Sequence, residues 1–169
     1  DFPKPKLSSD NYITTSDAIS DLPSLENDLG SESVKYPVSP KSDYQKMMRK
    51  NSSLIYNHIG TRHTEYVKSV IFHEAWTRYN SKKPSRTIDT GHRNHFHYKW
   101  NRVPTVRENA RLQSFPDDFH FLGTKTQQYR QVGNAVPPLL AQALAEKILK
   151  HLKYEDTSAD VNKQMDLEI

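Results

Sequence analysis

A short segment between residues 82 and 94 carries the side chains best suited to contact a nucleic acid. Arg93 and Asn94 stand next to each other there; arginine can bind a guanine edge through two hydrogen bonds, and asparagine an adenine edge. Gly91 would let the backbone approach a ligand closely, because glycine has no Cβ. Lysines precede this loop and are suited to phosphates, which carry no base information. The candidate DNA-binding residues are therefore Lys82, Lys83, Thr87, Thr90, Gly91, His92, Arg93 and Asn94.

Two other interpretations of this segment stay open. Arg93 could pair with Asp89, which is close in sequence, and simply hold the loop. His92, His95 and His97 could be taken for a metal triad. Zinc sites are built from cysteine, histidine and carboxylate ligands, and no cysteine or carboxylate cluster stands nearby. We therefore favour hydrogen-bonding or stacking roles for these histidines and predict no metal site.

A second basic cluster is formed by Lys41, Lys46, Arg49 and Lys50. It is equally compatible with a solvated helix face and with phosphate contact. The whole chain carries a net charge of +4 with a pI of about 9.2, which is compatible with DNA but also typical of a mildly basic surface.

Composition narrows the possible chemistry. With 169 residues, 34% hydrophobic content and a mean hydropathy of −0.86, the chain can bury only a small core. The sequence has no cysteine, which excludes disulfides, thiolate metal sites and a cysteine nucleophile. It shows no apolar run that could span a bilayer and no signal peptide, so we expect a cytoplasmic protein without a membrane partner. The chain begins with Asp1 rather than methionine, which suggests a piece of a longer protein.

Local signals predict the elements that would position these residues. Thr105 and Glu108 have the spacing of a capping box, so a helix should start there and end before Phe115-Pro116. Further helices are expected over 14–22, with Thr15 or Ser16 as cap, from Ser42 or Asp43 to Arg49, and over 62–72. Segments 85–89 and 96–100 resemble strands. The prediction is an α+β fold with a small twisted sheet around residues 85–100 and helices on both sides.

The region after residue 126 has a different pattern. Gly133-Asn134 is typical of a turn, and Pro137-Pro138 suits the first turn of a helix. That helix would carry one apolar stripe, because four residues follow at a spacing of four: Leu140, Leu144, Ile148 and Leu152. Free amides at the start of a helix can also bind a carboxylate.

Two blocks of this chain together resemble the last two shared motifs of the DNA (cytosine-5) methyltransferases. They read T-V-R-E-N-A-R-L-Q-S-F-P-D and Q-V-G-N-A-V-P-P, in the family's order and at its spacing. The resemblance implies the target recognition domain of a bacterial-type enzyme, followed by a C-terminal helix that belongs with a Rossmann-like catalytic domain. It also implies S-adenosylmethionine as cofactor and double-stranded DNA as substrate.

The resemblance assigns roles to matching residues only. Asn134, Ala135 and Val136 would line the S-adenosylmethionine pocket, while a set of structural residues organises the recognition domain and the turn: Thr105, Arg107, Glu108, Arg111, Gln131 and Gly133. The family's catalytic cysteine has no counterpart, so no catalytic residue is predicted. The implied divisions are a linker over 1–13, a recognition domain over 14–125, a docking segment over 126–152 and a flexible tail over 153–169.

The expected function is therefore that of a C-terminal fragment or small subunit of a cytosine-5 DNA methyltransferase, inactive without its catalytic half. That half would be part of the same longer chain or a separate subunit. The alternative is a non-catalytic DNA-binding or regulatory module derived from the same fold.

Overall fold

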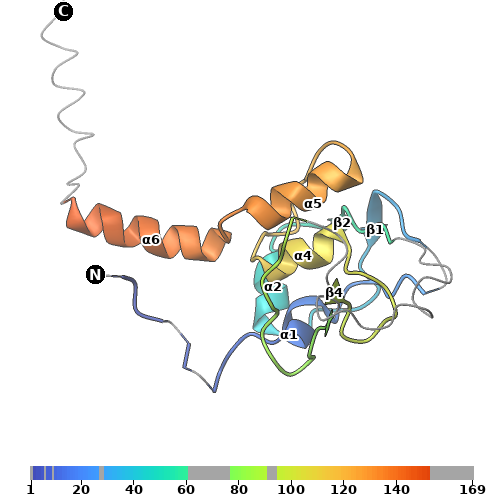
Figure 1. Cartoon of the computed structure of the whole chain (residues 1–169), viewed down its shortest axis with the longest axis horizontal. Helices are drawn as coiled ribbons and strands as arrows, with labels where there is room; N and C mark the ends of the chain where they lie inside the picture. The colour runs from blue at the N-terminus through green and yellow to red at the C-terminus, as the bar shows by residue number, and fades with distance from the viewer. Residues whose placement is uncertain are drawn as a thin grey trace, which may run out of the picture. The chain divides into compact units, whose positions relative to one another are not determined.

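The computed structural model describes residues 2–5, 7–8, 10–26, 29–60, 77–90 and 95–152. The chain divides into two compact units, one spanning residues 7–138 and the other combining residues 1–6 with 139–169. Helices and small sheets are mixed in the described residues, so the fold is α+β (Figure 1). In chain order, the elements are α1 (Thr15–Ile19), β1 (Ser33–Lys35), α2 (Asp43–Arg49), β2 (Leu54–Tyr56), β3 (Thr77–Arg78), β4 (His95–Phe96), α4 (Val106–Leu112), α5 (Lys125–Asn134) and α6 (Pro138–His151).

The sheets differ from the predicted one. β1 pairs with β2 in antiparallel register, with Val34 opposite Ile55. β3 pairs with β4 in parallel register, with Thr77 opposite His95. Residues 85–89 form no strand, and of the strand expected over 96–100 only Phe96 is in a strand, as the second residue of β4. The prediction of a single sheet around 85–100 is therefore wrong, because β4 pairs with β3 instead and Ile88 is buried in an apolar cluster with α4 and α5.

Helix starts follow the sequence closely. Thr105 and Glu108 form the predicted capping box at α4, and Ser42 caps α2 as expected. The cap of α1 is Thr14, one residue before the predicted Thr15 or Ser16, because Thr14 makes its own capping box with Asp17. The predicted helix over 62–72 lies outside the described residues.

The predicted end of α4 is confirmed, whereas the turn predicted after residue 132 is not. α4 stops at Leu112, before Phe115-Pro116, and Ser114 adopts a left-handed φ of 61° that redirects the chain. The turn predicted at Gly133-Asn134 is wrong, because both residues complete α5 and the extended cap is Ala135. The next helix does begin at the proline pair, with Pro138 as the first residue of α6.

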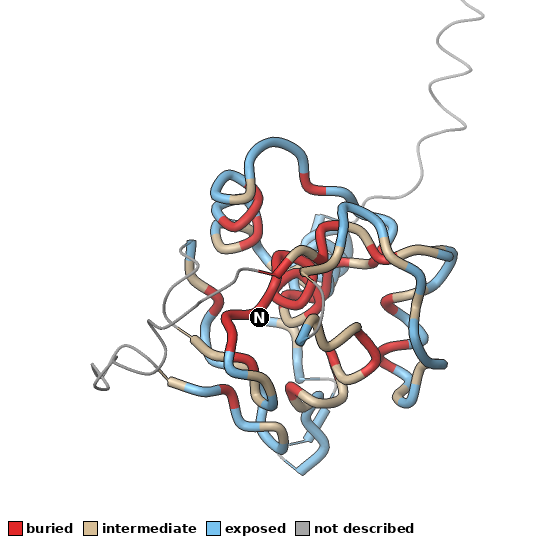
Figure 2. Tube along the Cα trace, turned by 90° about the vertical axis from the view of Figure 1, so that its right-hand side faces the viewer, coloured by how far each residue is buried: buried red, intermediate tan, exposed pale blue. Residues whose placement is uncertain are grey.

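The core of the larger unit consists of two apolar clusters. One joins α4 and α5 and contains Tyr79, Ile88, Val106, Ala110, Phe115, Phe121, Tyr129 and Val132. The other joins α1, α2 and β2 and contains Ala18, Ile19, Leu22, Tyr44, Met48 and Ile55. Tyr98 and Leu112 pack against both. Figure 2 shows the buried stretches running through the interior of this unit, with exposed residues around them.

Helix α6 leaves much of its apolar side exposed. Leu140 is 49% exposed, Ile148 57% and Leu152 66%, while Leu144 is half-buried. The predicted stripe is therefore present on the surface of the described chain. None of the described helices combines the length and apolarity needed to cross a membrane.

Candidate nucleic-acid interface

The basic segment that starts at Lys82 is held by the first turn of α1. The backbone amide of Thr15 donates to the Lys83 carbonyl at 2.9 Å, and the amide of Ser16 donates to Ser81 at 3.2 Å. The Thr15 hydroxyl also donates to the Lys83 carbonyl, at 3.1 Å. The backbone is thus fixed while the side chains of Lys82 and Lys83 remain exposed. This arrangement suits phosphate contact, because exposed cations on a held backbone lose little order on binding.

Further along this segment, one residue is buried in the core. Ile88 is 7% exposed and belongs to the apolar cluster of α4 and α5, whereas Thr87 and Thr90 are exposed on either side of it. The remaining predicted reading residues, Gly91 to Asn94, lie outside the described residues, and so does any pairing of Arg93 with Asp89. The structure therefore fixes the base of this loop and presents its two threonines to solvent.

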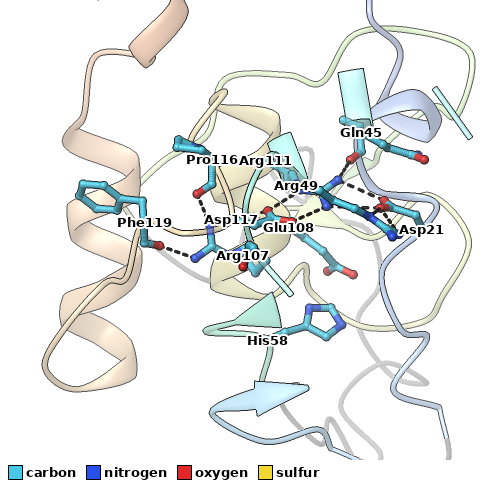
Figure 3. Close-up of polar contacts among 12 residues, drawn as sticks. Asp21, Gln45, Arg49, His58, Arg107, Glu108, Arg111, Pro116, Asp117 and Phe119 are labelled. Atoms are coloured by element: carbon cyan, nitrogen blue, oxygen red, sulfur yellow. Dashed lines mark hydrogen bonds and ion pairs between the residues drawn. The ribbon is translucent and has the colours of Figure 1, made fainter. Parts of the chain in front are cut away.

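Arg111 is the centre of a buried ionic cluster (Figure 3). Its guanidinium binds both oxygens of Asp117 at 2.6 Å, and it also contacts Asp21 at 3.1 Å and 3.3 Å. Arg49 reaches the same Asp21 from α2 at 2.7 Å. Burial opposes the charge, but the hydrogen bonds and charge of Asp117, and then those of Asp21, raise the pKa of Arg111 above its ordinary value.

This cluster changes the interpretation of the second basic patch. Arg49 is turned inward, with its guanidinium 3.8 Å from the Tyr36 ring centre and a hydrogen bond of 2.7 Å to the Val38 carbonyl. Lys46 forms a surface ion pair with Asp43 at 2.7 Å. Phosphate contact is therefore not the role of Arg49, which instead joins α2 to α4 through Asp21.

Arg107 is equally buried but is satisfied mainly by backbone. It donates to the carbonyls of Tyr56 at 2.9 Å and Pro116 at 3.0 Å, and to that of Phe119 (Figure 3). Its nearest carboxylate oxygen, on Asp117, is 3.9 Å away. Burial lowers the pKa of Arg107 to about 10, so the side chain remains a cation at neutral pH.

Glu108 forms a second buried cluster on another side of α4. The Arg102 guanidinium donates to both carboxylate oxygens of Glu108 at 2.7 Å each. The Thr105 amide donates to the same carboxylate at 2.8 Å. Burial favours the neutral acid, but Arg102 outweighs burial and holds the pKa of Glu108 well below its usual range. The nearest ring nitrogen of His97 lies 3.6 Å from the same carboxylate.

Burial disfavours the charged form of two histidines, and the hydrogen bonds of one of them, His97, identify it as neutral. His97 Nδ1 accepts from the amides of Lys99 and Trp100 at 3.0 and 3.1 Å, so its proton is on Nε2. Burial lowers the pKa of His97 to about 4. His58 contacts the Pro23 carbonyl at 3.0 Å and the Thr105 hydroxyl at 2.9 Å, and burial lowers its pKa too. The described part of the chain holds no group of three or more His, Asp or Glu side chains placed to bind a metal.

The predicted cofactor residues lie at the end of α5 and directly after it. Asn134 is exposed, Ala135 is half-buried and extended (φ −77°, ψ 146°), and Val136 is 58% exposed. Gly133 and Ala135 line one side of a hollow of about 360 Å³, whose other walls come from 85–88 and from the end of α4. The predicted cofactor-binding segment and the base of the predicted DNA-binding loop therefore border the same hollow.

Two glutamines fasten this end of α5. Gln131 is exposed and donates to the Leu122 carbonyl at 2.8 Å, which ties α5 to the loop before it. Gln113, the cap of α4, donates to the Val132 carbonyl at 2.6 Å. The two shared sequence blocks are thus joined by a direct hydrogen bond, which the sequence did not indicate.

Comparison with known proteins settles the family. Residues 1–150 match the family model of the C-5 cytosine-specific DNA methylases. The chain belongs to this family. The cytosine-specific methylases use S-adenosylmethionine as methyl donor, so the cofactor predicted from the sequence is confirmed for the family.

Individual methylases align with most of this chain, but this chain aligns with less than half of each of them. The chain is 38% identical to the type II methyltransferase M.DdeI of Desulfomicrobium norvegicum, over 86% of this chain and 45% of the relative. It is 36% identical to M.NgoFVII of Neisseria gonorrhoeae, over 91% of this chain and 40% of that protein. The chain therefore spans less than half the length of these relatives.

A solved structure agrees with the assignment. It is described as a DNA modification methyltransferase encoded within an E. coli prophage, and it superposes with a TM-score of 0.65 at 26% identity. The match covers 82% of this chain and 47% of the other chain.

The main residues that sequence reasoning missed are the partners of this methylase chain's buried charges. Asp117 stands inside the F-P-D motif, so a search for a counterion near Arg111 could have found it. Asp21 and Arg102 carry no such signal, because Asp21 is 90 residues from Arg111 and Arg102 lies in an irregular segment.

Proposed function

We propose that this chain is the C-terminal, target-recognising part of a DNA (cytosine-5) methyltransferase, acting with a catalytic half that supplies a cysteine nucleophile. The observation that carries the proposal is the pairing of the family's last two motifs with a sequence that contains no cysteine. The family's thiolate must then come from elsewhere. The chain matches less than half of M.DdeI, which supports a separate part that carries the catalytic cysteine.

Within this proposal, the chain contributes one wall of the S-adenosylmethionine pocket. Asn134 supplies an exposed amide group and Val136 an exposed apolar surface, and these fit the mixed polar and apolar character of that cofactor. The cofactor supplies the transferred methyl group when bound. Because one wall alone buries little of a ligand, the isolated chain should not bind S-adenosylmethionine at micromolar concentration, which calorimetry can measure.

DNA is read, in this proposal, by the segment between Lys82 and Asn94. The exposed lysines contact phosphates and Arg93 contacts a base edge. Arg93→Ala should relax site choice in the complete enzyme, while Lys82→Ala should weaken binding to all sequences and reduce its salt dependence. Methylation of matched and single-mismatch duplexes by both variants measures this difference. If Arg93→Ala slows all duplexes by one common factor, Arg93 does not read a base.

Reconstitution tests the whole proposal. The chain is mixed with the part of a relative such as M.DdeI that it does not match, and transfer of a labelled methyl group to duplex DNA is measured. Activity should require both parts and should disappear when the partner's cysteine is replaced by serine. If no such partner gives transfer while the chain alone binds DNA tightly, a non-catalytic DNA-binding module is the better description.

A further inference from the structure

Gly133 occupies the closest approach between the two functional regions of this chain. It lies in the last turn of α5, directly before Asn134, and it packs against the backbone where residues 89 and 90 meet. A Cβ at this position would overlap the carbonyl group of Asp89 and come within 2.6 Å of the Thr90 nitrogen. All three obstructing atoms belong to backbone, so no side-chain rotation could relieve the overlap.

This contact bears directly on the DNA-reading segment. Thr90 is the last described residue before Gly91 to Asn94, and the same segment is anchored upstream by Ile88 in the core. Any residue larger than glycine at 133 must therefore push residues 89–90 away from α5. The base of the loop would move even though the side chain at 133 touches no DNA.

We infer that Gly133 is a positioning residue for site choice: it lets α5 lie directly against Asp89 and Thr90 and so fixes where the DNA-reading loop leaves the fold. The inference rests on the proposed function, since it assumes that this loop reads bases. It also links the two proposed sites. The residue after Gly133 is Asn134, which we assign to the cofactor pocket, so one short segment contacts both the cofactor and the base of the DNA-reading loop. A displaced loop base misplaces the reading side chains, and small displacements from a productive geometry are costly.

The test is Gly133→Ala in the complete, reconstituted methyltransferase. The preference for the matched duplex over single-mismatch duplexes, taken as a ratio of kcat/KM values, should fall roughly ten- to a hundredfold. A change confined to stability or to cofactor binding would slow all duplexes alike and leave this ratio unchanged. An unchanged ratio in an active enzyme overturns the inference, whereas absence of methyl transfer by the unmutated enzyme would instead overturn the proposed function.

Gly60→Ala is the matched control. Gly60 is buried, but a Cβ there would meet only the Leu25 side chain at 3.3 Å and the Leu29 carbonyl at 3.6 Å. These contacts can be accommodated by a small shift of a flexible leucine. The control should therefore retain the duplex preference of the unmutated enzyme.

Amide hydrogen exchange in the 169-residue chain gives a second measurement that does not depend on the catalytic half. Peptides covering 85–90 should exchange faster in Gly133→Ala, while those covering α4 should not change. Replacing a helical glycine by alanine ordinarily stabilises a helix, so a raised melting temperature with unchanged exchange would contradict the close packing. A Gly133→Ala chain that fails to fold would show that the contact supports the entire core, and this result would also overturn the inference.

Discussion

Helices α4 and α6 reverse the usual relation between polarity and burial. α4 buries Arg107 and Arg111 completely and leaves Glu108 1% exposed. α6 exposes Leu140 and Ile148 by about half. The usual expectation is the opposite, since charged residues are rarely buried unless they are paired.

This difference in burial indicates that α4 has its interaction partners within the chain, whereas those of α6 would lie in another part of the protein. The charges of α4 are matched within the chain, by carboxylates, by Arg102 and by backbone carbonyls. Buried ion pairs add little net stability compared with apolar packing, but losing one partner is costly. Most of the apolar stripe of α6 is exposed in the described chain, which is why we assign it to a surface of the proposed catalytic half.

The largest expected effect comes from removing Arg111. Arg111→Ala would leave Asp21 and Asp117 buried with much of their compensating charge gone, and it should lower the free energy of unfolding by about 3–5 kcal/mol. Urea unfolding followed by circular dichroism measures the loss. Arg130→Ala is the control, because Arg130 is exposed on α5 and should change stability by less than about 0.5 kcal/mol. A loss below about 1 kcal/mol for Arg111→Ala would mean that the cluster is not coupled as the distances indicate.

A somewhat smaller loss is expected for Glu108→Gln. The amide keeps the shape of the side chain but removes the charge that Arg102 binds, which should cost about 2–4 kcal/mol. Arg102 is 7% exposed and can recover some solvation, so the effect should not exceed that of Arg111→Ala.

The double variant Arg102→Met, Glu108→Leu sharpens this test. It removes both charges together, so no buried charge of the pair is left alone, and it should be more stable than Glu108→Gln. If the double variant is instead the less stable of the two, the pair contributes specific stability beyond the avoidance of an unpaired charge.

Acid should lower the stability of the fold through His97, which lies beside Glu108. His97 has a pKa of about 4 in the folded chain, against about 6.5 in the unfolded chain, so the unfolded state binds more protons between these values. Its contribution is complete above pH 6.5 and is lost as the pH falls toward 4, by at most about 3 kcal/mol. The charged or titratable groups that act on this ring are Glu108, Arg102, His58 and Arg78, and burial lowers the pKa of His58 in the same direction.

The measurement is the melting temperature of the unmutated chain and of His97→Asn between pH 4 and 7. Asparagine can keep an acceptor near the amides of Lys99 and Trp100 but does not titrate. Its stability should therefore fall less steeply with decreasing pH. Parallel pH profiles for the two proteins would show that His97 is not responsible for the acid sensitivity.

The sequence predicted what depends on neighbours along the chain. The capping box of Thr105 with Glu108 and the cap at Ser42 need only three or four consecutive residues, and both are confirmed. Pro138 begins α6 for a similarly local reason.

What could not be predicted depends on residues far apart. Segment 85–89 has the composition of a strand, but α1 binds the chain before it at Lys83 and Gly133 packs against its end at Asp89, and the segment forms no strand. The turn expected at Gly133 fails for the same reason, since its glycine serves close helix packing rather than a change of direction. The partners of Arg111 and Glu108 likewise become visible only once the chain is folded.

The smallest effect on stability, and the largest on assembly, is expected for α6. Leu140→Asp with Ile148→Asp places charges on side chains that are already about half exposed, so the free energy of unfolding of the isolated chain should change by less than about 1 kcal/mol. In the reconstitution, however, the same charges would have to be buried against the catalytic half, and methyl transfer and co-purification should be lost. Gln142→Asp adds a charge about 160° around the helix from Leu140 and should leave assembly intact. If both variants assemble equally well, the apolar stripe of α6 is not the docking surface, and its exposure needs another explanation.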